Sequence, residues 1–176
     1  VASTGVIGVP LPIDKAEAGL DAAFVAESCG WEAVAETIGT TDTFTKGAFT
    51  TARIGDRTVK LSGVIKGSGM IAPDMATMLC FLFTDAAVAP APLQAILKSG
   101  ADTSFNCMTV DGDTSTSDTC LLFATGAAAK RGQTMIDKVG DPALAEFQAA
   151  VHDLLKELAI MVAKDGEGVS KFVTID

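Results

Sequence analysis

Hydrophobic and polar residues along the chain follow two periods, one typical of helices and one typical of strands. The three-and-four spacing of a helix is clearest near the C-terminus, where Asp141-Pro142 opens a long helix. The apolar stripe of this helix comprises Leu144, Phe147, Val151, Leu154, Leu155, Leu158 and Val162. His152, the only histidine, falls outside the stripe, so we expect it on the polar face of a surface helix.

Three shorter helices are predicted upstream by the same spacing. The first is capped by Asp14 and ended by Gly30, the second covers residues 31–37, and the third covers residues 90–98. We expect the third helix to turn three apolar side chains inward, namely Leu93, Ile96 and Leu97.

Strand-like alternation appears between these helices. Residues 49–53 and 58–65 alternate, and Gly55-Asp56 between them predicts a hairpin. Residues 78–83 form a continuous apolar run, which is typical of a strand covered on both faces. Shorter strands are predicted at residues 108–110, 119–124 and 172–175. Since no repeat or linker divides the 176 residues, the pattern predicts a single α+β domain.

Composition and charge exclude several classes of partner. The net charge is −9 with 13 scattered basic residues, which argues against nucleic acid and against anionic membranes. No apolar run approaches the roughly 18 to 20 residues of a spanning helix, and no signal peptide pattern opens the chain.

The cysteines carry no recognisable motif. Cys29, Cys80, Cys107 and Cys120 are widely spaced without a CxxC pair, and with one histidine they would supply a zinc site poorly. We expect small buried thiols in a reducing compartment, hence a cytoplasmic protein.

The segment of residues 66–79 contains the strongest chemical signal. Its Gly-rich, Pro-bearing turn leads to Ala76-Thr77, directly before the apolar run. If the Ala76–Thr77 peptide bond is cut, Thr77 gains a free α-amino group beside its own hydroxyl, so nucleophile and base belong to one residue. An α-amine, with a pKa of about 7.7 to 8.0, accepts a proton near neutral pH far more readily than a lysine does. The alternative interpretation of this segment is an ordinary loop that leads into a buried strand, with no cleavage.

This fourteen-residue segment, continued by Thr84-Asp85-Ala86, resembles the self-cleavage site of the ornithine acetyltransferase family. These are the bifunctional glutamate N-acetyltransferases of arginine biosynthesis. Residues 1–12, 40–43, 110–118 and 165–168 resemble further family segments, in the family's order. The resemblance implies catalytic roles for Thr77, Thr4 and Gly5, with Thr4 and Gly5 in the oxyanion hole. It implies substrate contacts from Thr43, Lys66, Thr77 and Glu167.

The resemblance also implies a fold, a reaction and partners. The fold would be a layered sandwich of two packed sheets beneath outer helices. Acetyl would move from N-acetylornithine to glutamate through acetyl-Thr77, without a cofactor or metal, although acetyl-CoA could be a second donor. Family members are about twice as long, so we expect a central fragment. Cleavage would make residues 1–76 the end of an α chain and residues 77–176 the start of a β chain, in an α/β hetero-oligomer.

Two alternatives stay open on the residues alone. The same self-activated threonine serves amidohydrolases and aminopeptidases, in which water takes the acyl group. In a different class, Asp111 and Asp113 fit short D-x-D and D-x-S-x-S patterns of a Mg²⁺-dependent phosphatase or a metal-binding module. A turn whose side chains bond their own backbone explains the same residues.

Overall fold

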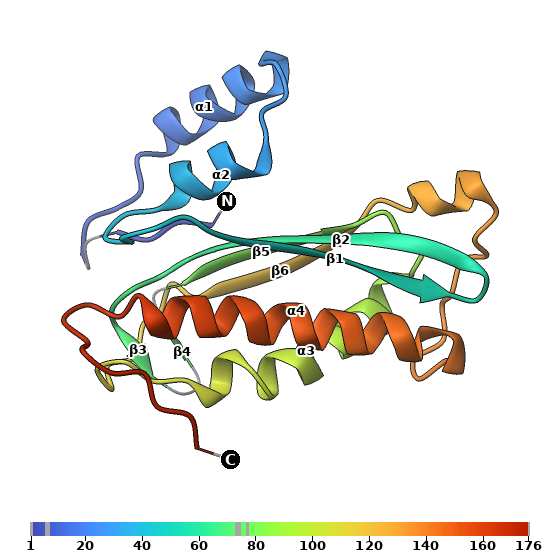
Figure 1. Ribbon diagram of the computed structural model, residues 1–176. Coiled ribbons are helices and arrows are strands. Elements are labelled where there is room, and N and C mark those ends of the chain that lie inside the picture. The colour runs from blue at the N-terminus through green and yellow to red at the C-terminus, as the bar shows by residue number, and fades with distance from the viewer. Residues whose placement is uncertain (1, 6–7, 73–74, 77, 176) are drawn as a thin grey trace.

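A mixed four-stranded sheet forms the centre of the fold, with helices on both of its sides (Figure 1). The computed structural model describes residues 2–5, 8–72, 75–76 and 78–175, and for residues 72, 75 and 76 only the backbone. The sheet has the order β1-β2-β5-β6, in which β6 alone runs parallel to its neighbour. Its strands are β1 (Lys46–Ile54), β2 (Arg57–Lys66), β5 (Leu79–Thr84) and β6 (Thr119–Ala124). The α+β class is therefore confirmed.

The predicted hairpin joins β1 to β2. Gly55 has a φ of 62°, a left-handed conformation that glycine adopts without steric penalty, and it reverses the chain beside Asp56. The resulting register pairs Lys46 with Ile65 at the far end of the hairpin. A second, two-stranded sheet consists of β3 (Ile71–Ala72) and β4 (Met75–Ala76).

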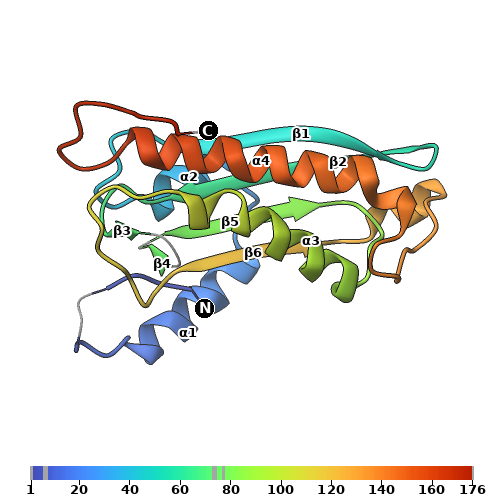
Figure 2. The ribbon, with the colours of Figure 1, turned by 90° about the horizontal axis from the view of Figure 1, so that it is seen from below.

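Two helices cover one face of the four-stranded sheet (Figure 2). They are α3 (Pro90–Asp102) and α4 (Ala145–Lys164). Asp141 opens the region as predicted, because its side chain accepts the N–H of Ala143 in the short 3-10 helix Pro142–Leu144 that precedes α4. All seven residues of the predicted apolar stripe are buried in the core against the sheet, as are Leu93, Ile96 and Leu97 of α3.

The opposite face of the sheet is only partly covered, by α2 (Trp31–Ile38), and α1 (Ile13–Val25) lies on the same side but farther from the strands (Figure 1). A row of aromatic rings crosses this face, with ring centroids 5.0 Å apart for Trp31–Phe83 and 5.1 Å apart for Phe83–Phe123. Phe49 is 84% exposed there. We expected this strand, β5, to be covered on both faces. It is fully covered only on the face that α3 and α4 pack against, because Phe81 and Phe83 on the other face are half-buried.

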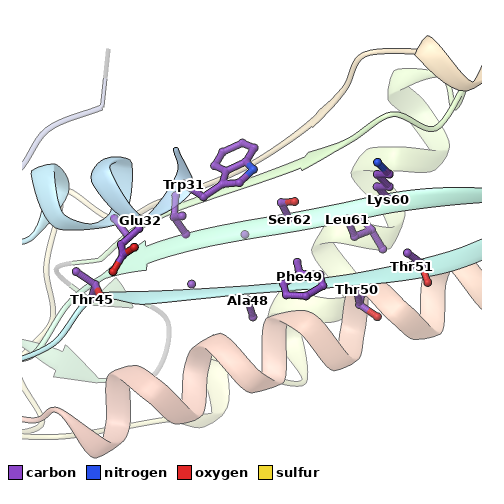
Figure 3. Close-up of a pocket in the computed structure, with 14 residues that line it drawn as sticks. Trp31, Glu32, Thr45, Ala48, Phe49, Thr50, Thr51, Lys60, Leu61 and Ser62 are labelled. Carbon is purple, nitrogen blue, oxygen red and sulfur yellow. The ribbon is translucent and has the colours of Figure 1, made fainter. Parts of the chain in front are cut away.

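A groove of about 590 Å³ lies on this open face, between α2 and the β1–β2 hairpin (Figure 3). Trp31 and Glu32 of α2 and Phe49 and Ser62 of the hairpin are among the residues that line it. None of the predicted catalytic or substrate-binding residues is among its described lining residues.

The start of the chain differs locally from the prediction. Pro12, not Asp14, occupies the N-cap of α1, so Asp14 lies inside the first turn, and no side chain caps the helix. The helix ends at Val25 rather than at Gly30, because Ala26 is already extended. No residue of α1 is buried. The second helix agrees with its prediction.

Two predicted strands are wrong. Val110 donates its N–H to the carbonyl of Ile71, but the ladder stops there because the Asp111 carboxylate takes the N–H of Ile71. Residues 172–175 are exposed and have no strand partner among the described residues, since their apolar side chains pack on no other layer of the fold. The remaining short elements are 3-10 helices at Phe105–Cys107 and Ala127–Arg131.

Two side-chain expectations are also corrected. His152 is half-buried and faces α3 rather than solvent, with Nε2 3.0 Å from Ser99 Oγ. All four cysteines are free, but Cys29 and Cys107 are exposed, and only Cys80 is fully buried.

The predicted sandwich of two packed sheets is not confirmed. The described strands form one four-stranded sheet and the small β3–β4 pair. No helix among the described residues is both long and apolar enough to cross a membrane.

Candidate active site

Buried charged residues lie together at one end of the four-stranded sheet, where strands begin or end. Lys46 begins β1, Lys66 ends β2, Met78 precedes β5 and Asp118 precedes β6. The register pairs Lys66 with Leu79, and Leu79 in turn with Thr119. These strand ends therefore lie side by side. One of them, the start of β5, comes just after the predicted cleavage point in the sequence.

Lys66 is buried at the end of β2, with 3% of its surface exposed. Its Nζ donates to Thr40 Oγ1 at 3.1 Å, in the loop predicted to contact substrate. Burial lowers the pKa of Lys66 below its usual 10.5, and the negative charges of Asp42 and Asp118 oppose that shift. A lysine held this way is suited to pair with a ligand carboxylate that replaces its lost hydration.

A buried ionic cluster, which was not among the predictions from sequence, supports that loop. Lys46 is fully buried, and its Nζ lies 2.5 Å from Asp42 Oδ1 and 2.5 Å from Asp165 Oδ2. Burial acts to raise the pKa of both aspartates, but the hydrogen bonds from Lys46 and from backbone N–H groups outweigh it and hold their pKa values below 3.8. We call Lys46, Asp42 and Asp165 the anchor cluster.

The anchor cluster brings together the three predicted substrate-binding segments. Thr43 donates both its backbone N–H, at 2.9 Å, and its hydroxyl to Asp165. Gly67, next to Lys66, donates its N–H to Asp42 at 2.8 Å. Glu167 follows two residues after Asp165. The cluster thus joins the loops at residues 40–43, 67–69 and 165–168.

Glu167 is held against the glycine-rich turn. Its N–H donates to the carbonyl of Ser68 at 2.7 Å, and its Oε1 lies 3.5 Å from Ser68 Oγ. A Cβ at Gly69 would meet the Glu167 carboxyl carbon at 3.1 Å, so glycine allows this close approach. Because Glu167 itself is exposed, its carboxylate stays accessible to a ligand.

Asp118 is a further acidic residue at this end of the sheet that sequence reasoning passed over. Its Oδ1 accepts the N–H of Met78 at 2.9 Å, while its Oδ2 is buried without a hydrogen-bond partner among the described residues. Burial raises the pKa of Asp118 to about 6, although the positive charge of Lys66 opposes the shift.

The remaining predicted site residues are placed only in part. Thr77 lies outside the described residues, and Ala76 is described by its backbone alone, paired with Ile71. Thr4 is half-buried and Gly5 exposed, and no hydrogen bond between described residues joins them to the anchor cluster. Their roles remain predictions.

The Asp-rich loop has a structural use. Asp111 accepts three backbone N–H groups, those of Met70 at 2.6 Å, Ile71 at 3.1 Å and Asp113 at 3.0 Å. These bonds hold the loop to the turn at Met70, whose φ is 56°. Within the part of the chain that the structure describes, no group of three or more His, Cys, Asp or Glu side chains could hold a metal ion.

Parts of this site could have been found by extending the strand alternation. Continued backwards from Ile54 and Ala52, the inner face of β1 includes Lys46, which predicts a buried lysine and hence buried acidic partners. Asp118 offers no such signal, because it lies among several polar loop residues and only the parallel pairing of β6 with β5 brings it to Met78.

The fold and these strand ends define the class of protein: an α+β protein with a buried cluster of charged side chains at the ends of its strands. The chain belongs to the ArgJ family, whose family model matches residues 1–176.

Curated relatives agree with this assignment. The chain is 54% identical to the arginine biosynthesis bifunctional protein ArgJ of Bradyrhizobium diazoefficiens over 176 residues. It is 53% identical to proteins of the same name from Rhizobium meliloti, over 176 residues, and Zymomonas mobilis, over 175 residues. These matches cover 99% of this chain but only 42–43% of each relative. The chain therefore spans less than half the length of the relatives it matches.

Proposed function

We propose that this chain is the central part of a glutamate N-acetyltransferase of the ornithine acetyltransferase type, which moves an acetyl group from N-acetylornithine to glutamate. The observation that carries the proposal is that buried Lys66, the loop of Thr43 and the loop of Glu167 lie together. They do so at the end of the sheet where β5 begins, two residues after Thr77. Two amino-acid substrates that share a carboxylate and amino groups fit a site with both a buried cation and an accessible carboxylate.

The nucleophile would be produced by self-cleavage. The hydroxyl of Thr77 attacks the carbonyl carbon of Ala76, the C–N bond breaks as the acyl group shifts to oxygen, and water hydrolyses the ester. Ala76 is left with a carboxylate, and Thr77 regains its hydroxyl beside a free α-amine.

Acetyl transfer would follow in two half-reactions. The α-amine takes the proton of the Thr77 hydroxyl, whose oxygen attacks the acetyl carbon of N-acetylornithine, and ornithine leaves with that proton on its amine. The amine of glutamate then attacks the acetyl ester, N-acetylglutamate departs, and the hydroxyl of Thr77 is restored. Thr4 and the Gly5 N–H would stabilise each oxyanion, an effect of roughly 3 to 4 kcal/mol per donor.

The described contacts support the substrate roles. Lys66 would pair with a substrate carboxylate, because its hydrogen bond to Thr40 leaves two N–H groups for a ligand. The Thr43 hydroxyl already donates to Asp165, so toward a ligand it would act as an acceptor. The exposed Glu167 carboxylate would bind a substrate ammonium group.

No cofactor is needed for this chemistry. The word "bifunctional" in the relatives' name supports acetyl-CoA as a second acetyl donor. We further propose a cytoplasmic protein, in keeping with four free thiols and small amino-acid substrates, and an α/β hetero-oligomer built from one cleaved precursor.

The partly covered face of the sheet supports the predicted two-sheet sandwich. Phe49, Leu121 and Phe123 are exposed on the strands, beside the groove under Trp31. We propose that a part of the parent chain outside these 176 residues supplies a second sheet that covers this face.

The decisive experiment compares the full-length parent with its Thr77→Ala variant. Denatured intact mass should show two chains meeting at Ala76 and Thr77 in the parent and one uncut chain in the variant. Purified parent should form N-acetylglutamate from N-acetylornithine and glutamate, and the variant should not. An uncut parent would refute the proposal, and acetate release independent of glutamate would identify a hydrolase instead.

A further inference from the structure

The Asp118 carboxylate is only half used. Oδ1 accepts the N–H of Met78 at 2.9 Å, but Oδ2 is buried and accepts no hydrogen bond from any described residue. A buried carboxylate oxygen without a donor is unfavourable, and such groups in folded proteins usually mark a partner that is absent. Asp118 Oδ2 can therefore accept one more hydrogen bond, close to the backbone of Met78.

Covalent geometry limits where that donor can come from. The backbone nitrogens of consecutive residues lie roughly 3 Å apart, which follows from standard bond lengths. The two oxygens of a carboxylate can accept hydrogen bonds from two neighbouring donors at once, so a carboxylate that binds one backbone nitrogen can also bind the nitrogen of the residue before it. For Asp118 that preceding residue is Thr77.

We propose that Asp118 is a positioning residue that binds the α-amino group which Thr77 acquires on cleavage, with Oδ1 on the Met78 N–H and Oδ2 on the new amine. This proposal rests on the proposed self-cleavage before Thr77. In the uncut chain the Thr77 nitrogen is an amide with one N–H, whereas after cleavage it is an amine that carries two or three N–H groups and a positive charge when protonated.

The charges around Asp118 fit this role. Among the described residues, Lys66 at the end of β2 is the charged group that acts on Asp118, and the charge of Lys66 is itself balanced by Asp42 of the anchor cluster. Lys66 gives its described hydrogen bond to Thr40 rather than to Asp118, so the free oxygen is left for the amine. Above about pH 6 the Asp118 carboxylate is ionised and attracts an ammonium group.

Binding to Asp118 would have two consequences for Thr77. An adjacent carboxylate raises the pKa of an amine by about 1–3 units, which makes the amine a stronger base once it is deprotonated. The contact would also fix the direction of the amine relative to the hydroxyl, which a freely rotating chain terminus would not do.

The test is Asp118→Asn in the full-length parent. The Asn carbonyl still accepts the Met78 N–H, but the charge and the second acceptor oxygen are removed. The pKa of the Thr77 amine would be measured from the pH dependence of its labelling by an amine-reactive reagent, quantified by mass spectrometry on the N-terminal peptide. We expect the amine pKa to fall by at least about one unit, labelling at pH 7 to rise roughly tenfold, and the acidic limb of kcat/KM to move to lower pH.

Asp113→Asn is the matched control, because Asp113 is an exposed acid of the same loop whose side chain makes no described hydrogen bond. Its amine pKa should equal that of the parent. If Asp118→Asn is not cut, the same titration applies to two co-expressed chains in which removal of the initiator Met frees Thr77.

The possible failures are distinguishable. An unchanged amine pKa in Asp118→Asn, with a cleaved parent, overturns the role of Asp118 and leaves the proposed function intact. A parent that is never cut refutes the proposed function itself.

Discussion

At the scale of single residues, Lys46 is the side chain on which the site's arrangement most depends. Lys46→Met would leave the carboxylates of Asp42 and Asp165 buried without a cation, with only 6% and 2% of their side chains exposed. We expect a loss of about 3–5 kcal/mol in the free energy of unfolding at pH 7, measured by urea denaturation. In full-length parent, KM for both substrates should rise, because Thr43 and Glu167 lose their support.

The pH dependence of this variant follows from the signs of the shifts. In the folded protein the pKa values of Asp42 and Asp165 lie below 3.8, so their stabilising effect is present above about pH 4 and is lost as the pH falls through the folded values. The difference between Lys46→Met and the original chain should therefore narrow on acidification. Lys98→Met, which breaks the exposed pair with Asp102, is the control and should change stability little. An equally small effect at Lys46 would contradict the role of the anchor cluster.

The same scale shows how far sequence reasoning reached into the site. Lys66, Thr43 and Glu167 were predicted by resemblance, and the structure brings their loops together. Asp165 and Asp118 were missed because their importance depends on partners 119 and 40 positions away, Lys46 and Met78. Local periodicity carries no information about such long-range pairs.

At the scale of elements, the packing of α3 on α4 depends on a small residue. A Cβ at Gly100 of α3 would lie 2.5 Å from Leu155 Cδ1 and 2.8 Å from His152 Cδ2. Gly100→Ala should therefore destabilise the chain by about 1–2 kcal/mol in urea unfolding, because overpacking outweighs the gain in helix propensity.

A matched substitution in α1 separates packing from propensity. Gly19 lies in the middle of α1, and a Cβ there would meet no described atom within 4 Å. Gly19→Ala should leave stability unchanged or raise it by up to about 1 kcal/mol. Two effects of the same sign and size would show that the close approach of α3 to α4 does not limit the residue at Gly100.

The elements that sequence predicted well are those whose periodicity persists. α4 was predicted with all of its buried residues except Ala159, because the spacing continues over five turns. β1 and β2 were predicted because a glycine turn separates two alternating runs. The strands that were predicted wrongly, at residues 108–110 and 172–175, are only three and four residues long. Residues 108–110 have strand composition, but the Asp111 carboxylate competes for the backbone N–H of their partner Ile71.

At the scale of the whole molecule, burial is asymmetric across the sheet. The face that α3 and α4 cover is packed with fully buried Leu, Val and Phe side chains. The other face exposes aromatic rings beside a groove. Apolar surface gathered over several strands is typical of an interface with another layer. The proposed second layer would come from the part of the parent that these 176 residues do not include, since the matched relatives are more than twice as long as this chain.

The proposed second layer is tested by comparing one substitution in two contexts. Phe49 is 84% exposed on β1, so Phe49→Asp in the isolated 176-residue chain should change the free energy of unfolding by no more than about 1 kcal/mol, the range of strand propensity. In the full-length parent the same substitution should cost several times more, because it would place a charge between two packed layers.

Two further variants make this comparison specific. Phe49→Leu keeps the position apolar and should be tolerated in both contexts, while Phe147→Asp, at a fully buried position of α4, should unfold both. If Phe49→Asp has the same small effect in the isolated chain and in the parent, no second sheet packs on Phe49. The row of aromatic rings would then lie on the surface of the full-length parent. The fold would be a single sheet with helices rather than a sandwich of two sheets.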